Sequence, residues 1–366
     1  ADDGRQEVYG NISSILEGLD LSALDEYLKS HGNGLLASLG DTAKDIVNYL
    51  VHGNTGINFN SYIGELFSVL LGDVRSLLPA FAQIAALCML SAVAGSTEGG
   101  LMSSSTVKIV RTVCCVLIIT LLSAMLAGII ATAADCIDGV RAQIEIITPI
   151  LITLTVMTGG SGAGAIYRPS ALFISGGAVE MVGGIVIPAA SAVILINFIS
   201  KLAPGLSFSG TAVLIKNILK WAMGITLAVF SIFITVQSTA ASLFDGIFFK
   251  ATKYLVGSSV PIVGNFLSSG VDMIVAAGSV IRSSVGIVGI ILLVAEVAPP
   301  IIMLIAFSLI LKLMAAIVQP LGENTLCSLF SDLASDIEYI MAGVCVVAFL
   351  YALIVMLIIS SAVNFI

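Results

Sequence analysis

Long stretches without a single charged residue constrain this chain more than any other feature. Thr112–Ala134 is a run of 23 uncharged residues, and Trp221–Leu243 and Tyr339–Val363 are further runs of the same kind. A helix needs about 20 predominantly apolar residues to cross the hydrocarbon core of a bilayer. Within that core, only helices and closed barrels pair all of their backbone polar groups. The three runs therefore predict an all-α, polytopic membrane helix bundle.

Five more runs are apolar but are shorter or interrupted: Leu77–Val93, Ile147–Ile166, Ala171–Ser200, Val260–Ile281 and Val285–Leu311. Two long stretches, 171–200 and 284–318, contain glycine or proline breaks, at Pro188 and at Pro299-Pro300. If each stretch crosses once, the flanking Lys and Arg divide six to five between the two sides. If each is a hairpin that returns to its own side, they divide eight to three, which the positive-inside rule favours. We therefore expect about six full crossings plus two Gly/Pro-broken hairpins, with the acidic stretch 323–338 as an inner loop.

Two octets indicate an internal repeat of about 110 residues. Thr132–Gly139 and Thr239–Gly246 are identical at five of eight positions, at an offset of 107. Three landmarks follow in the same order at offsets of 111 or 112, namely Pro149 with Pro261, Pro188 with Pro300, and Lys201 with Lys312. Such a period is typical of duplicated halves in membrane bundles. We place the copies at about 106–205 and 211–322, parallel in the hairpin topology and inverted if the broken stretches cross once.

The net charge of −8 is concentrated near the amino terminus. Residues 1–76 hold 11 acidic and 4 basic side chains, whereas the other 290 residues hold 12 and 11. We divide the chain into an acidic segment with short amphipathic helices (1–59), an interfacial amphipathic helix (60–76) and a transmembrane domain (77–366). The start at Ala1-Asp2-Asp3, without methionine, is what removal of a signal peptide leaves, and would make the segment extracytoplasmic. The alternative is that the sequence simply begins there.

Several classes of function are disfavoured by the composition. Lys and Arg number 15 against 23 Asp and Glu, without a basic patch for nucleic acid. The six cysteines form no CxxC pair, and His31 and His52 are too far apart in sequence to indicate a metal site. Gly159–Gly164 resembles a phosphate loop but lacks its Gly-Lys-Ser/Thr ending. We expect no enzyme, and no catalytic, cofactor-binding or metal-binding residues.

Glu180 and Glu296 are the candidate functional residues. Each is a carboxylate inside an apolar run. An acid within a membrane segment is costly, and by default it marks a functional site. The alternative is a structural role, in which the acid caps a broken helix or lies in the headgroup zone beside Gly183-Gly184 or Pro299-Pro300.

The chain resembles the stage III sporulation protein AE family, polytopic membrane proteins of endospore-forming Firmicutes. The resemblance spans most of the chain and is carried by stretches that contain no catalytic motif: Leu19–Leu28 with Lys44–Val47, Gly64–Val93, Thr239–Ala241 with Thr252–Gly257, Val260–Gly264 through Val285–Gly289, and Gln319–Asn324.

The resemblance implies a removed signal peptide and a place in the mother-cell membrane around the forespore. It also implies partners, namely the other stage III A-operon proteins and the forespore stage II protein Q, in a secretion-like channel complex. The leading hypothesis is that the chain is a structural or conduit-forming subunit of that complex. One copy is too small to enclose a wide pore, so a wide pore would need a homo-oligomer. The alternative is a secondary transporter of a small solute, with broken helices and intramembrane glutamates.

Overall fold

The described part of the chain is helical, with no strand in it. The computed structural model describes residues 12, 14–31, 42–52, 59–97, 103–158, 173–202, 208–259 and 263–360. Within these ranges six helices are long and apolar enough to cross a membrane. The prediction of an all-α, multi-pass membrane bundle is therefore confirmed.

In the described part of the chain, short helices precede the six long ones. They are α2 (Ser22–His31) and α4 (Ala43–Val51), followed by α5 (Phe59–Ser96), α6 (Ser104–Met157), the π-helical turns η1 (Ile174–Val179) and η2 (Val182–Val186), α8 (Ile187–Leu202), α9 (Ser209–Ser259), α10 (Val263–Val318), the 3₁₀ turn η3 (Gln319–Leu321) and α11 (Asn324–Ser360). The turn between α10 and α11 depends on Gly322, whose φ of 76° is left-handed and favours glycine.

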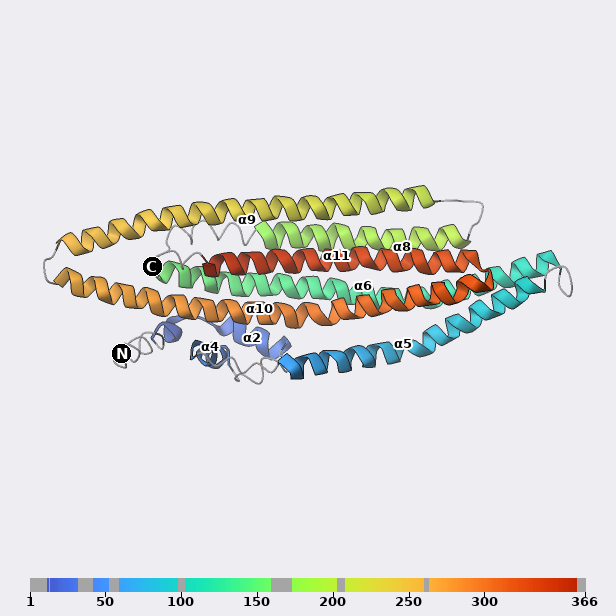
Figure 1. Cartoon of the computed structure of the whole chain (residues 1–366), viewed down its shortest axis with the longest axis horizontal. Helices are drawn as coiled ribbons and strands as arrows, with labels where there is room; N and C mark the ends of the chain where they lie inside the picture. Colours follow the sequence, from blue (N-terminus) through green and yellow to red (C-terminus); the bar gives the residue numbers. More distant parts are fainter. Residues whose placement is uncertain are drawn as a thin grey trace.

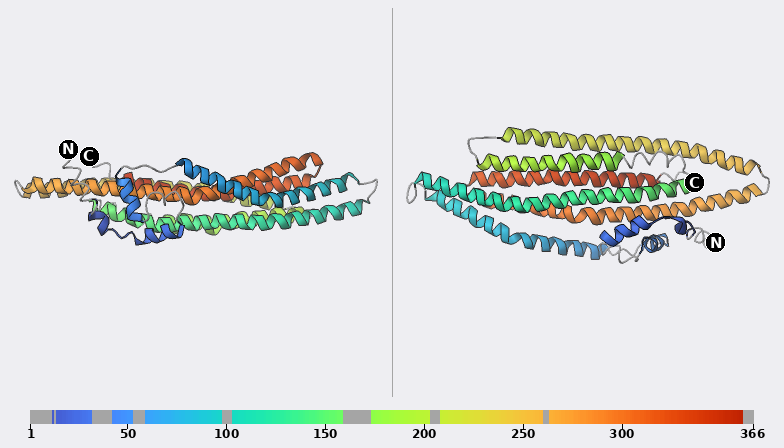
Figure 2. Two further views of the ribbon diagram at one scale, coloured as in Figure 1. Left: turned by 90° about the horizontal axis from the view of Figure 1, so that it is seen from below. Right: turned by 180° about the vertical axis from the view of Figure 1, so that it is seen from behind.

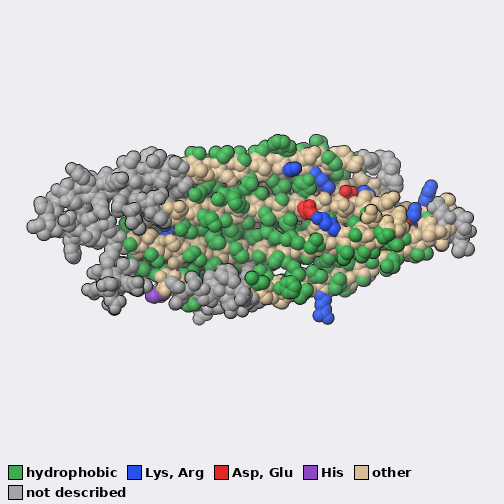
Figure 3. Space-filling view, in the orientation of Figure 1, with side chains coloured by type: hydrophobic (Ala, Val, Ile, Leu, Met, Phe, Trp, Pro, Cys, Tyr) green, Lys and Arg blue, Asp and Glu red, His purple; other side chains and the backbone are tan. Residues whose placement is uncertain are grey.

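The long helices lie side by side along one axis and form a flat slab (Figures 1 and 2). In Figure 1, α9 lies along one edge and α5 along the other. The last helix, α11, packs against α6, α8, α9 and α10, and it therefore forms the centre of the core. Leu350, Tyr351 and Ile354 of α11 are fully buried there. Figure 3 shows one apolar face, with most of the visible charges gathered toward one end of the slab.

The expected hairpins are wrong. Residues 263–318 form the single helix α10, which continues through Pro299 and Pro300. Residues 173–202 are helical throughout, with two π-helical turns at the glycines and Pro188 in the first turn of α8. Prolines are tolerated in membrane helices because neighbouring helices and local π-helical adjustments satisfy the freed backbone groups. Each stretch is thus one long apolar helix.

The crossings expected at 112–134 and 147–166 are also joined, because α6 is continuous over 54 residues. Residues 60–76 are likewise the first half of α5. At about 1.5 Å per residue, α6 is roughly 80 Å long, against a hydrocarbon core of about 30 Å. The Gly159–Gly164 stretch lies outside the described residues.

Corresponding parts of the two expected copies run in the same direction. In Figure 1, α6 and α9 both start at the right-hand end of the slab, and α8 and α10 both return to it. The two stretches compared thus run parallel to each other, and each contributes two long helices. The repeat itself stays a prediction from the sequence.

Candidate functional site

Polar side chains gather in two regions of the slab. The first is the end where α6, α9 and α11 begin and α5, α8 and α10 finish (Figure 1), which we call the cation-rich end. The parts of these helices that lie at this end carry six basic residues: Lys108, Arg111, Lys201, Lys216, Lys220 and Lys312. The second region lies farther along α6 and α10, around Glu296.

At the cation-rich end, α11 and the residue before it bind cations from four other helices. The pairs are Arg111 with Glu323 (3.1 Å), Lys201 with Asp332 (3.2 Å), Lys216 with Asp336 (2.7 Å) and Lys312 with Glu338 (2.5 Å). The stretch 323–338, which was expected to be a loop, is therefore mostly helix. Its acids connect α6, α8, α9 and α10 to the central helix.

Asp336 forms the most buried of these pairs. Its residue is 1% exposed. Lys216 Nζ approaches Oδ1 at 2.7 Å, and Asn197 Nδ2 donates to Oδ2 at 2.6 Å. A buried carboxylate needs this kind of compensation, since its charge has lost its water. The group fixes α8, α9 and α11 to one another.

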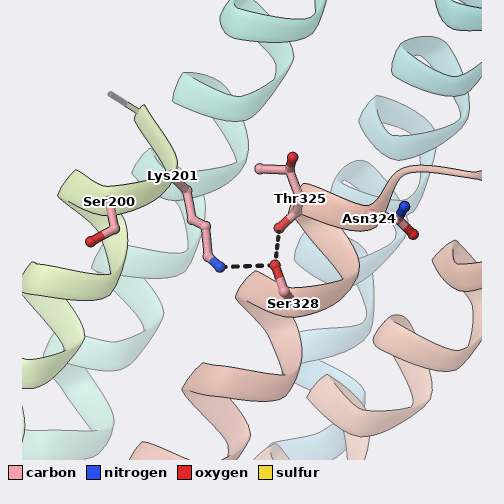
Figure 4. A pocket seen from close by; sticks show the side chains of 5 residues that line it. All are labelled: Ser200, Lys201, Asn324, Thr325 and Ser328. Atoms are coloured by element: carbon pink, nitrogen blue, oxygen red, sulfur yellow. Dashed lines mark hydrogen bonds between the residues drawn. The ribbon is translucent and has the colours of Figure 1, made fainter. Parts of the chain in front are cut away.

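A small open pocket of about 340 Å³ lies beside this network, between the end of α8 and the first turn of α11. Figure 4 shows Lys201 reaching across it to Ser328, whose Oγ accepts from Nζ at 2.8 Å. Lys201 also pairs with Asp332. Its charge is therefore already compensated within the chain.

The second region surrounds Glu296 of α10. The hydroxyl of Tyr27, on α2, donates to Glu296 Oε2 at 3.3 Å and accepts from Gln143 Nε2 of α6 at 3.0 Å. Gln143 Nε2 also donates to the carbonyl of Leu292 at 3.2 Å, which fixes the orientation of the amide. Tyr27 is only 5% exposed. The amino-terminal segment is thus attached to the bundle at one of the two candidate residues.

The ionisation of Tyr27 follows from this burial. Loss of solvent raises the pKa of Tyr27 to about 12, and the charge of Glu296 adds to the rise. The hydroxyl consequently keeps its proton at neutral pH and remains a donor to the carboxylate.

Glu180 belongs to a different environment. Its Oε2 lies 3.3 Å from Arg141 Nη1, and Arg141 also pairs with Glu145 at 3.2 Å. The Glu180 side chain is 65% exposed. Gly139, which faces Glu296, and Arg141 are two positions apart on α6, and therefore point about 200° away from each other. The structure places the two candidates on opposite sides of α6.

Other polar residues of the core were not singled out from the sequence. Tyr27, Gln143, Asn197 and Asp336 carry no local motif. Arg282, one of the flanking basic residues counted for the topology, is 1% exposed and donates to Thr155 Oγ1 at 3.2 Å. One feature of the sequence could have indicated the group around Asp336. Asp332 and Asp336 lie four residues apart, and hence on one face of a helix.

Gly139 allows Glu296 to lie against α6. A Cβ at this position would collide with the Glu296 carboxylate. We expect Gly139→Ala to push the carboxylate away from Tyr27 and to destabilise the docked segment by about 1 kcal/mol, the value of a typical hydrogen bond. Gly128→Ala, on the same helix with no atom within 4 Å, is the control and should be neutral or stabilising. Protease cleavage before α5 measures both, and equal rates would contradict the role of Gly139.

Comparison with known proteins gives one consistent match. The family model described as stage III sporulation protein AE matches residues 42–362. The stage III sporulation protein AE of Bacillus subtilis (strain 168) is 23% identical over 323 residues, which cover 88% of this chain and 81% of that protein. No solved structure matches the chain.

Proposed function

Because this chain belongs to the stage III sporulation protein AE family, we propose that it is a structural or conduit-forming membrane subunit of the channel complex between mother cell and forespore. The family implies a role in sporulation. The observation that carries the finer proposal is the flat slab of long apolar helices, which offers two broad faces for neighbours (Figure 2).

The shape favours assembly with other subunits. A slab in which the helices lie side by side cannot surround a wide pore alone, so a pore of that kind needs several copies or additional proteins. The partners we propose are the other stage III A-operon proteins and the forespore stage II protein Q. Apolar side chains along the α9 edge, among them Leu214, Trp221 and Ile225, are exposed and suit contact with lipid or with a neighbouring membrane helix.

The distribution of charge supports an orientation. Six basic residues lie at the cation-rich end, which the positive-inside rule assigns to the mother-cell cytoplasm. The helices α2 and α4 lie beside the half of α10 that is remote from this end (Figure 1). We accordingly place the segment 1–59 on the extracytoplasmic side and propose the mother-cell membrane as the location. The transmembrane domain, 77–366, then contains both repeat copies.

The environments of the glutamates support a structural subunit over a solute transporter. Glu180 is exposed and paired with Arg141, while Glu296 holds Tyr27 on the other side of α6. A transport site needs groups that converge on one bound solute. These two carboxylates instead have separate partners within the chain.

The test neutralises Glu180 in the native sporulating host. We expect Glu180→Gln to give the wild-type number of heat-resistant spores and to co-purify with the operon partners, because the carboxylate makes one exposed ion pair worth less than about 1 kcal/mol. Asp336→Ala is the positive control for loss of the subunit. The proposal fails if the purified protein alone moves a solute into liposomes with saturation that Glu180→Gln abolishes.

A further inference from the structure

The long helices of the slab extend well beyond the thickness of a bilayer. There are 56 residues in α10 and 54 in α6, so each helix is roughly 80 Å long, against a hydrocarbon core of about 30 Å. A bilayer therefore covers less than half of either helix. Hydropathy does not say which part, because both helices are apolar over most of their length. The positions of the charged side chains do distinguish the parts.

Starting from the cation-rich end, several helices share an uncharged stretch of one bilayer thickness. It contains 21 residues in α5 (76–96), 23 in α6 (112–134) and 20 in the helical stretch that ends in α8 (181–200). About 20 predominantly apolar residues cross the hydrocarbon core. In α10 the stretch 297–311 is shorter, but the exposed Lys312 at its end suits the headgroup zone, toward which long cationic side chains extend.

At the far end of these stretches, charged residues from three elements lie at one level. Arg141 of α6 pairs with Glu180 at 3.3 Å, and Glu296 of α10 lies against Gly139 of α6. Asp135, which ends the uncharged stretch of α6, is exposed and only about 9 Å along the axis from Arg141. These charges form a narrow band across the slab. We call it the polar boundary, made of Asp135, Arg141, Glu180 and Glu296.

Beyond the polar boundary, α2 and α4 lie beside α10 (Figure 1). Their apolar side chains face the rest of the chain, since Leu24 and Val47 are fully buried. Their charged side chains, among them Glu26, Lys29 and Lys44, are exposed. A helix that lies in a lipid interface directs its apolar face into the acyl chains. These two helices direct a charged face outward instead, so water and not hydrocarbon surrounds this half of α10.

We propose that the bilayer covers only the part of the slab between the cation-rich end and the polar boundary. Glu180 and Glu296 then lie at the level of the lipid headgroups, where an exposed carboxylate such as Glu180 avoids the cost of contact with hydrocarbon. The remainder of the slab stands outside the bilayer. In α10 it comprises residues 263–295, about 50 Å of helix.

Quenching of tryptophan fluorescence by brominated lipid tests this placement in the full chain. The chain has one tryptophan, Trp221, so Trp221→Phe gives a background without tryptophan emission. In this background, Ile305→Trp and Ile287→Trp form a matched pair on α10. Each position is nine residues from Glu296, about 14 Å along the axis, but on opposite sides of it. Their exposed fractions are similar, 42% and 46%.

In vesicles of phosphatidylcholine with brominated acyl chains, we expect Ile305→Trp to be quenched at least about threefold more strongly than Ile287→Trp, because only position 305 lies in hydrocarbon. Aqueous iodide should quench the two in the reverse order. Leu117→Trp and Val156→Trp repeat the comparison on α6, at side chains 47% and 46% exposed, and serve if an α10 variant does not fold. Equal quenching by brominated lipid within either folded pair, or stronger quenching beyond the polar boundary, overturns the proposal.

Discussion

Replacing Asp336 with alanine should destabilise the slab more than the loss of any exposed ion pair. The change leaves the Lys216 ammonium, whose side chain is 17% exposed, without its carboxylate and the Asn197 amide without its acceptor. Breaking a buried pair from one side costs about 3–5 kcal/mol. We expect Tm of the purified protein to fall by about 5 °C or more.

Two matched variants serve as controls for Asp336→Ala. Glu338→Ala, on the same helix as Asp336, removes the ion pair with Lys312 of α10. The two side chains are 44% and 53% exposed, so the change should cost less than about 1 kcal/mol. Lys216→Met combined with Asp336→Leu replaces both charges by apolar groups and should recover most of the stability. Equal melting temperatures for Asp336→Ala and Glu338→Ala would contradict the role given to the buried pair.

Replacing Tyr27 with alanine should release the amino-terminal segment from the bundle. Truncating a fully buried aromatic side chain costs about 3–5 kcal/mol, and here the cost falls on the docking of α2. We expect cleavage by added protease before α5 to be at least about a hundredfold faster than in the unaltered chain, since every 1.4 kcal/mol corresponds to a factor of ten.

Two controls separate packing from hydrogen bonding. Tyr27→Phe keeps the ring and removes only the hydroxyl contacts with Glu296 and Gln143, so its effect should be near 1 kcal/mol. Tyr49→Ala alters a half-buried tyrosine of α4 and should have a smaller effect than Tyr27→Ala. Docking through Tyr27 is refuted if Tyr27→Ala resists protease as well as the unaltered chain does.

The membrane helices were predictable because a long hydrophobic run indicates a helix surrounded by lipid. The points at which these helices end were less predictable. The stretch from Asp135 to Glu145 contains four charged residues, and on composition alone it separates two crossings. In the structure it is helical, with Asp135, Asp138 and Glu145 along one exposed stripe at spacings of three and seven residues. A stripe of charge on one face leaves the other face of α6 free to pack, so the helix does not need to end.

The candidate residues could be found from the sequence because a carboxylate inside a membrane segment costs free energy. Their roles could not be found in this way. An acid among apolar residues is visible in any sequence, which is why Glu180 and Glu296 were selected. Their partners come from other elements: Tyr27 is 269 residues away from Glu296 in the chain. Likewise, nothing local to Asp336 indicates that Lys216 and Asn197 will meet it. Tertiary packing decides these contacts.

The continuity of α6 has a mechanical consequence. Arg111, bound to Glu323, and Gln143, bound to Tyr27, are 32 residues apart on one uninterrupted helix, a distance of roughly 48 Å. A helix of this kind curves gently but does not shorten. A force applied to the amino-terminal segment at Tyr27 is therefore delivered along a rigid rod to the opposite end of the molecule, and the two ends move as one body.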